Sequence, residues 1–88
     1  MREIRPGELL ELVADVVAPW DEYPVATVVY LRHRLAGVPH FRIARHYGTS
    51  EAAVRRSLQR LAASFGLRSQ EDLLTLAWRD GVRPAEID

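Results

Sequence analysis

The chain has 88 residues, which is enough for one small domain and too few for a multi-domain enzyme. Hydrophobic residues make up 48% and charged residues 27% of the sequence, so we expect a globular chain with a buried core. The absence of cysteine excludes disulfides and thiolate metal sites and makes the cytoplasm the expected compartment. We find no signal peptide and no membrane span, because acids and prolines interrupt every apolar run.

The formal net charge is zero, but the charges are unevenly distributed along the chain. Residues 1–31 carry two arginines and six acids (−4), residues 32–68 carry eight arginines and Glu51 (+7), and residues 69–88 carry two arginines and five acids (−3). Electrostatic attraction is screened beyond about 8 to 10 Å in physiological salt, so the middle segment can contact phosphates while the acidic ends face elsewhere. The planar fork of arginine suits phosphate and guanine, although a GC-rich genome would also favour arginine over lysine.

Apolar residues recur at helical spacing in five stretches that proline and glycine separate, and no stretch alternates convincingly as a strand. We therefore predict an all-α bundle of about five helices. The expected helices cover about residues 6–18, 24–36, 39–47, 51–65 and 69–80. The expected units are an N-terminal helical extension (1–22), a helical domain (23–81) and a tail (82–88) that frays.

The third and fourth predicted helices have the pattern of a helix-turn-helix. A turn of about four residues containing Gly48 joins them, and Ser50 is a good N-cap for the second. In this motif the second helix lies in the major groove of DNA, and its outer face carries donors for bases and phosphates. The polar side chains off the apolar stripe of the 51–65 helix are Arg55, Arg56, Ser57, Gln59 and Arg60, and we predict that they and Ser50 contact DNA. Periodicity alone would also fit a small helical bundle with another function.

The stretch RIARHYGTSEAAVRRSLQRLAASFGLRSQEDLLTLA resembles the LuxR/GerE type of helix-turn-helix DNA-binding domain. The similarity covers residues 24–80 and includes the GLRSQ segment, which a generic helix-turn-helix lacks. The resemblance implies that Arg55 faces the groove or its phosphates and that Arg60 contacts the DNA backbone. Three residues differ from the usual family run: Arg42 replaces Glu, Ala53 replaces Thr and Ser57 replaces His.

Further cations and the last predicted helix supply more candidate contacts. Arg42 and Arg45 on the 39–47 helix, together with Arg32 and Arg34, are candidates for phosphate contacts or for simple exposure to solvent. In LuxR-type domains the last helix commonly forms the dimer contact, so we predict a homodimer through a group of apolar residues on that helix. These residues are Leu73, Leu74, Ala77 and Trp78. The alternative is that this helix closes the monomer core and that the 6–18 helix shields Trp78.

The remaining conspicuous residues indicate no chemistry. His33, His40 and His46 are spaced by seven and six residues, which does not stack them on one helical face, so we predict no metal and no cofactor. No glycine-rich phosphate loop or nucleophile-and-base pair is recognisable, so we do not expect an enzyme. Trp20 and Tyr23 are expected to fill the core.

Two functions follow from these patterns. The first is a stand-alone, sequence-specific DNA-binding regulator of transcription that binds double-stranded DNA as a homodimer. The alternative is an adaptor with the same fold that binds a protein partner of the transcription machinery: a regulator, a sigma factor or an RNA polymerase subunit. The acidic N-terminal segment and the neutral net charge favour the adaptor.

Overall fold

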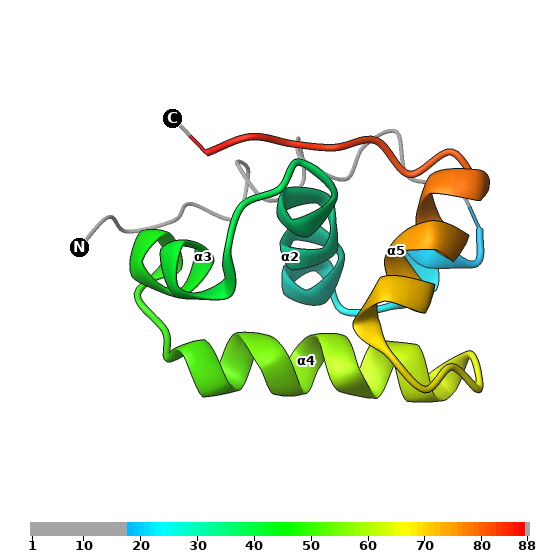
Figure 1. Ribbon diagram of the computed structural model, residues 1–88, viewed down its shortest axis with the longest axis horizontal. Coiled ribbons are helices and arrows are strands. Elements are labelled where there is room, and N and C mark those ends of the chain that lie inside the picture. The colour runs from blue at the N-terminus through cyan, green and yellow to red at the C-terminus, as the bar shows by residue number, and fades with distance from the viewer. Residues whose placement is uncertain (1–17, 88) are drawn as a thin grey trace.

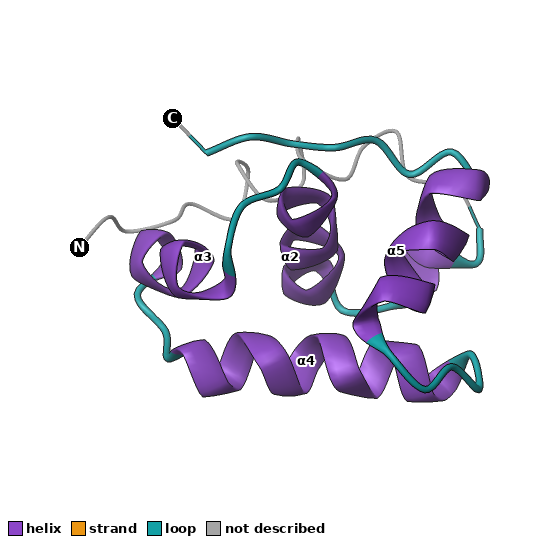
Figure 2. Ribbon diagram, viewed as in Figure 1, coloured by secondary structure: helices purple, strands orange, loops and turns teal. Residues whose placement is uncertain are grey.

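A computed structural model of the protein describes residues 18–87. Within this range the chain forms one short 3-10 helix and four α-helices, and it contains no strand (Figure 2), which confirms the all-α prediction. The elements are η1 (Trp20–Glu22), α2 (Val25–Leu35), α3 (His40–Tyr47), α4 (Glu51–Ser64) and α5 (Gln70–Arg79). The helix predicted over residues 6–18 lies almost entirely outside the described residues.

Serine residues cap the starts of α4 and α5, and the cap at Ser50 is the one that the sequence predicts. The Ser50 hydroxyl accepts a hydrogen bond from the Ala53 amide at 3.1 Å, and the Ser69 hydroxyl accepts one from the Asp72 amide at 3.1 Å. Each cap satisfies an amide that has no partner inside its helix, a contribution of about 1 kcal/mol. The caps therefore fix where α4 and α5 begin.

Glycine ends α3 and turns the chain into α4. Gly48 has φ 68° and ψ 34°, a left-handed conformation that other residues rarely adopt. The Thr49 amide then donates a hydrogen bond to the Ala44 carbonyl at 3.0 Å and closes the end of the helix. Only two residues, Thr49 and Ser50, separate this glycine from α4, so the turn between the two helices is short and rigidly defined.

Helix α4 lies along one edge of the molecule and contacts α2, α3 and α5, which stand on the same side of it (Figure 1). Its buried side is the stripe that the sequence predicts, with Val54, Leu58 and Leu61 almost fully buried. Burying a side chain of this size contributes about 1.5 to 3 kcal/mol. The stripe holds α4 against the body and leaves its opposite side in solvent.

Trp20 closes the core between η1 and the end of α5. Its ring is fully buried and lies 4.7 Å from the ring of Phe65, and its indole Nε1–H donates a hydrogen bond to the Asp80 carboxylate at 3.0 Å. Tyr23 is half-buried and also packs against Phe65, with the two ring centres 5.4 Å apart. Both aromatic residues therefore take the core positions that we predict for them.

The tail does not fray where the structure describes it, so that prediction is wrong for residues 82–87. Val82 is buried, and the tail runs across the molecule along the edge opposite α4 (Figure 1). The Ala85 amide donates to the Arg32 carbonyl at 3.0 Å, and Arg32 Nε donates to the Arg83 carbonyl at 2.8 Å. The hydrogen bonds that hold the tail are made mainly by its main-chain groups. Almost every residue has these groups, so the side-chain pattern of the sequence does not predict the contact.

Candidate nucleic-acid interface

The helix-turn-helix pair is present as a packed unit. Ile43 and Ala44 of α3 are buried in the same apolar cluster as Val54 and Leu58 of α4. Branched and small side chains at this crossing allow the two helices to approach closely. The packing fixes α4 relative to α3 and determines which side of α4 faces outward.

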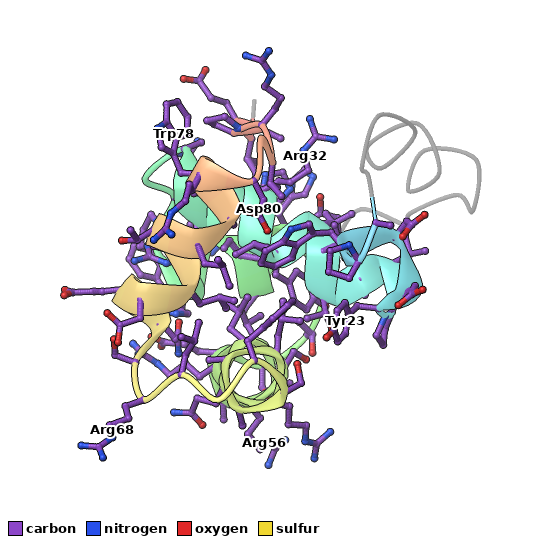
Figure 3. All side chains as sticks on the ribbon, turned by 90° about the vertical axis from the view of Figure 1, so that its right-hand side faces the viewer. Tyr23, Arg32, Arg56, Arg68, Trp78 and Asp80 are labelled. Atoms are coloured by element: carbon purple, nitrogen blue, oxygen red, sulfur yellow. The ribbon has the colours of Figure 1, made fainter. Side chains whose placement is uncertain are left out.

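The outward side of α4 carries most of the predicted DNA-contacting residues. Arg55, Arg56, Gln59 and Arg60 are all exposed, and Ser57 is half-buried at one margin of this face. Seen along the axis of α4, Arg56 points away from the body, and Arg68 from the turn before α5 points to the same side (Figure 3). Arg68 is not among the contacts predicted from the sequence, because it lies outside the helix-turn-helix.

The three arginines of α4 differ in their partners. Arg55 donates a hydrogen bond to Glu51 at 2.8 Å, in an exposed pair one helical turn apart. Such pairs contribute only about 0.3 to 0.5 kcal/mol. Arg56 and Arg60 have no hydrogen-bond or ion-pair partner among residues 18–87. Arg56 and Arg60 are therefore the cations of α4 that are best placed to bind an anion without first breaking a contact.

A helical turn separates Arg56 from Arg60 on the exposed face. Four residues advance a helix by about 6 Å, and successive bases of one DNA strand are about 3.4 Å apart. The two side chains therefore leave the helix at points about 6 Å apart along its axis, close to the distance between bases two steps apart. Each guanidinium has the planar pair of donors that matches guanine or a phosphate.

Ser50 and Ser57 occupy the margins of the candidate interface. The Ser50 hydroxyl oxygen accepts a hydrogen bond from the Ala53 amide when it caps α4. The hydroxyl can still donate its own proton to another acceptor. Ser57 lines a small open hollow of about 210 Å³ together with Tyr23, Thr27 and Arg60. Both serines thus border the face that Arg56 and Arg60 dominate.

The arginines of α3 and α2 differ in their exposure to solvent. Arg42 and Arg45 are exposed on α3, and Arg42 donates a hydrogen bond to the Ile87 carbonyl of the tail at 3.2 Å. Arg32 is only 9% exposed and is bonded to the tail, so it is not available as the phosphate contact considered from the sequence. Arg34 is half-buried and donates to the Val38 carbonyl at 2.8 Å.

His33 is buried in the polar contact between α2 and the tail. Its Nδ1 lies 2.6 Å from the Ala85 carbonyl, which can only accept, so Nδ1 carries a proton. Its Nε2 lies 2.5 Å from the Tyr47 hydroxyl. Burial lowers the pKa of His33, so the ring is neutral near pH 7 and Nε2 accepts the hydroxyl proton of Tyr47. The sequence gives no sign of this role.

An open hollow of about 600 Å³ lies beside α4, bounded also by residues of α2, α3 and α5. Its lining includes three arginines, Arg34, Arg55 and Arg68, and one carboxylate, Glu71. His40, at its margin, donates from Nε2 to the Gln70 side-chain oxygen at 2.7 Å. Burial lowers the pKa of His40, and the nearby Arg34 and Arg55 lower it further, so the charge of the hollow near pH 7 comes from arginine.

The predicted dimer residues are divided between the core and the surface. Leu73 and Ala77 are fully buried within the monomer, so their assignment to an interface is wrong and they belong to the core. The cause is that α5 packs against both α2 and α4, which uses its inward side completely. Leu74 is half-buried, and Trp78 is 63% exposed and points outward (Figure 3).

Residues 18–87 lack two kinds of feature, a metal-binding cluster and a membrane span. No group of three or more histidine, cysteine or carboxylate side chains is arranged to hold a metal ion in this range. No helix in the same range combines the length and the apolar character of a membrane span.

The chain was also compared with known proteins. No family model, no curated protein and no solved structure matches it.

Proposed function

We propose that the chain is a sequence-specific, DNA-binding regulator of transcription in which α4 enters the major groove. The observation that carries this proposal is that Arg56 and Arg60 are exposed on the side of α4 opposite its buried stripe and have no partner among residues 18–87. The short turn at Gly48 and the buried crossing of α3 and α4 support the same assignment, because a reading helix needs a rigid support. The sequence stretch that resembles LuxR/GerE domains covers the same helices and is consistent with this assignment.

The proposal does not require a basic protein overall. The acidic segments at the two ends cancel the net charge, but attraction to DNA acts over about one Debye length. The cations on the outward side of α4 are therefore sufficient to meet phosphates and bases locally. We propose the cytoplasm as the compartment in which a regulator of this kind works.

The test is a selection from random DNA duplexes, followed by affinity measurements on the selected and a scrambled duplex at two salt concentrations. We expect enrichment of a defined sequence and a steep loss of affinity with salt, because phosphate contacts release counterions. Absence of binding to any duplex at low salt would reject the proposal. That result would favour the adaptor that binds a protein partner, for which the exposed Trp78 offers an apolar anchor.

We also propose that the regulator acts as a homodimer through Trp78 and Leu74 of α5. Trp78 is the more exposed of the two large hydrophobic side chains that are exposed in residues 18–87, and a two-fold contact would cover it and space two α4 helices on half-sites. Sedimentation at tens of micromolar should give a dimer that Trp78→Glu dissociates. The control is Phe41→Glu, which changes the other exposed aromatic residue, on α3, and should leave the dimer intact. A monomeric wild-type protein would reject the dimer.

A further inference from the structure

The open hollow beside α4 gathers three arginines and the neutral His40 from four separate parts of the fold. Arg34 comes from the end of α2, His40 from the start of α3, Arg55 from α4 and Arg68 from the turn before α5. Three guanidinium groups and one carboxylate, that of Glu71, line the hollow, and Glu51 pairs with Arg55. Like charges around one hollow repel one another, so this composition favours an anion that bridges the arginines.

The three arginines of the hollow differ in their partners, and only Arg55 is paired with a carboxylate among residues 18–87. Arg34 donates to the Val38 carbonyl, which orients its guanidinium but does not cancel its charge, and its Nε is buried with no hydrogen-bond partner. Arg68 is exposed and has no ion-pair partner among residues 18–87. Arg55 is paired with Glu51 in an exposed contact that a phosphate can displace at low cost.

Polar groups next to these cations add hydrogen-bond donors. The Gln70 side-chain oxygen already accepts from His40, so its amide nitrogen keeps two protons for an anion. Gln59 of α4 also lines the hollow, and its amide can donate in the same way. Fixed cations and amide donors together form the chemistry that binds phosphate oxygens.

We propose that this hollow is a phosphate-binding site, occupied by a phosphate of the DNA strand that passes beside α4. The assignment to DNA rests on the proposed function. A helix in the major groove has a phosphate backbone on either side of it, and the groove is about 12 Å wide. The hollow flanks α4 at Arg55 and Gln59, beside the face on which Arg56 points outward, where such a strand would pass.

The same chemistry would accept a free phosphorylated compound, because an open hollow of about 600 Å³ has the size of a small-molecule site. The experiment therefore has two arms. The first measures duplex affinity against salt for wild type, Arg34→Gln and Arg68→Gln. The second titrates inorganic pyrophosphate into the same three proteins without DNA, by calorimetry. Arg79→Gln, which removes a charge from the far end of α5 outside the lining, is the control in both arms.

In the first arm, each hollow variant should reduce the slope of log K against log salt by about 0.9, the value for one lost phosphate contact. Affinity should fall equally for the selected and the scrambled duplex, because phosphates carry no sequence information. Arg79→Gln should leave the slope unchanged. Arg68→Gln lies in an exposed turn, so it tests the site even if Arg34→Gln proves unstable in thermal melting.

The outcomes separate this inference from the proposed function. Shallower slopes in both hollow variants support a DNA phosphate in the site. Unchanged slopes, with pyrophosphate binding that only the hollow variants lose, keep the phosphate site but assign it to a free phosphorylated compound. Unchanged slopes without pyrophosphate binding overturn the site while DNA binding stands. If the wild type binds no duplex, the proposed function fails, and the pyrophosphate arm alone decides the site.

Discussion

Two groups of basic residues from the same segment lie in opposite environments. Arg56 and Arg60 of α4 are exposed and have no partner within residues 18–87, whereas Arg32 and His33 of α2 are buried under the tail and bonded to it. The two groups lie toward opposite edges of the molecule, with α4 along one edge and the tail along the other (Figure 1). A charge count identifies the segment, but tertiary contacts decide which of its cations can reach a ligand.

The physical cost of the two environments differs accordingly. A buried polar group must be hydrogen-bonded, because leaving it without a partner costs about 1 to 3 kcal/mol. An exposed arginine keeps its water and contributes little to folding. Substitutions in the α2 group should therefore change stability, and substitutions in the α4 group should change binding.

The largest expected effect comes from a substitution in the buried group of α2. His33→Ala removes a side chain that is only 2% exposed, together with its hydrogen bonds to the Ala85 carbonyl and the Tyr47 hydroxyl. We expect the free energy of unfolding to fall by about 3 kcal/mol, from the lost hydrogen bonds and the cavity. Urea denaturation followed by circular dichroism measures it. Arg45→Ala, at an exposed position, is the control and should change stability by less than about 0.5 kcal/mol. A His33→Ala protein as stable as wild type would show that the tail contact is not needed.

The next effect addresses the exposed group. Arg56→Ala should weaken binding to the selected duplex by about 1 to 3 kcal/mol if Arg56 reads a base, with the free energy of unfolding unchanged. Arg55→Ala should cost less and make the salt dependence shallower, because Arg55 is shared with Glu51 and lines the phosphate hollow. Anisotropy titrations at two salt concentrations distinguish the two losses, with Arg79→Ala as the control. Full affinity in both variants would remove α4 from the interface.

A smaller effect concerns pH and the buried histidine. Burial lowers the pKa of His33 below its ordinary value of 6.5, with Arg32 and His46 adding repulsion, although the bond to Ala85 acts in the opposite direction. The unfolded chain therefore takes up a proton at this ring before the folded protein does. Stability should be complete above pH 6.5 and decline as the pH falls from 6.5 toward the lower folded-state pKa.

Chemical denaturation between pH 5 and pH 7.5 measures this decline. His33→Gln cannot titrate, yet its amide can donate to the Ala85 carbonyl and accept from Tyr47, so its stability should change less over the same range. His40 contributes a remaining decline of the same sign in both proteins, because its pKa is also lowered. Identical pH profiles for wild type and His33→Gln would show that the pKa of His33 is not shifted by folding.

Local signals predicted the helices well. Each signal lies within a few residues of the structure that it determines: the serine caps, Gly48 and the apolar stripe of α4. The observed ends of α2 to α5 differ from the predicted ends by no more than one residue. The candidate interface on α4 could be predicted for the same reason, since exposure follows from periodicity on a helix.

Contacts over long sequence separations could not be predicted. Arg32 meets Arg83 and His33 meets Ala85 across about fifty residues, and in both cases the partner is a carbonyl that every residue possesses. The hollow that joins Arg34 to Arg68 likewise depends on how α2 and α5 are placed around α4. The burial of Leu73 and Ala77 follows from the same packing, which a pattern of apolar residues on α5 does not specify.

The smallest expected effect tests whether the ion pair with Glu51 competes with DNA for Arg55 or positions Arg55 to contact it. Glu51→Gln removes the carboxylate that accepts from Arg55 and the favourable charge in the first turn of α4, so stability should fall by about 0.5 to 1 kcal/mol. Affinity for DNA should rise by up to about threefold, because a negative charge beside the phosphates is lost and Arg55 is released. Glu86→Gln in the tail is the control for charge alone. If Glu51→Gln instead weakens DNA binding, the ion pair positions Arg55 for its contact, and α4 contains one oriented cation beside the two unpaired ones.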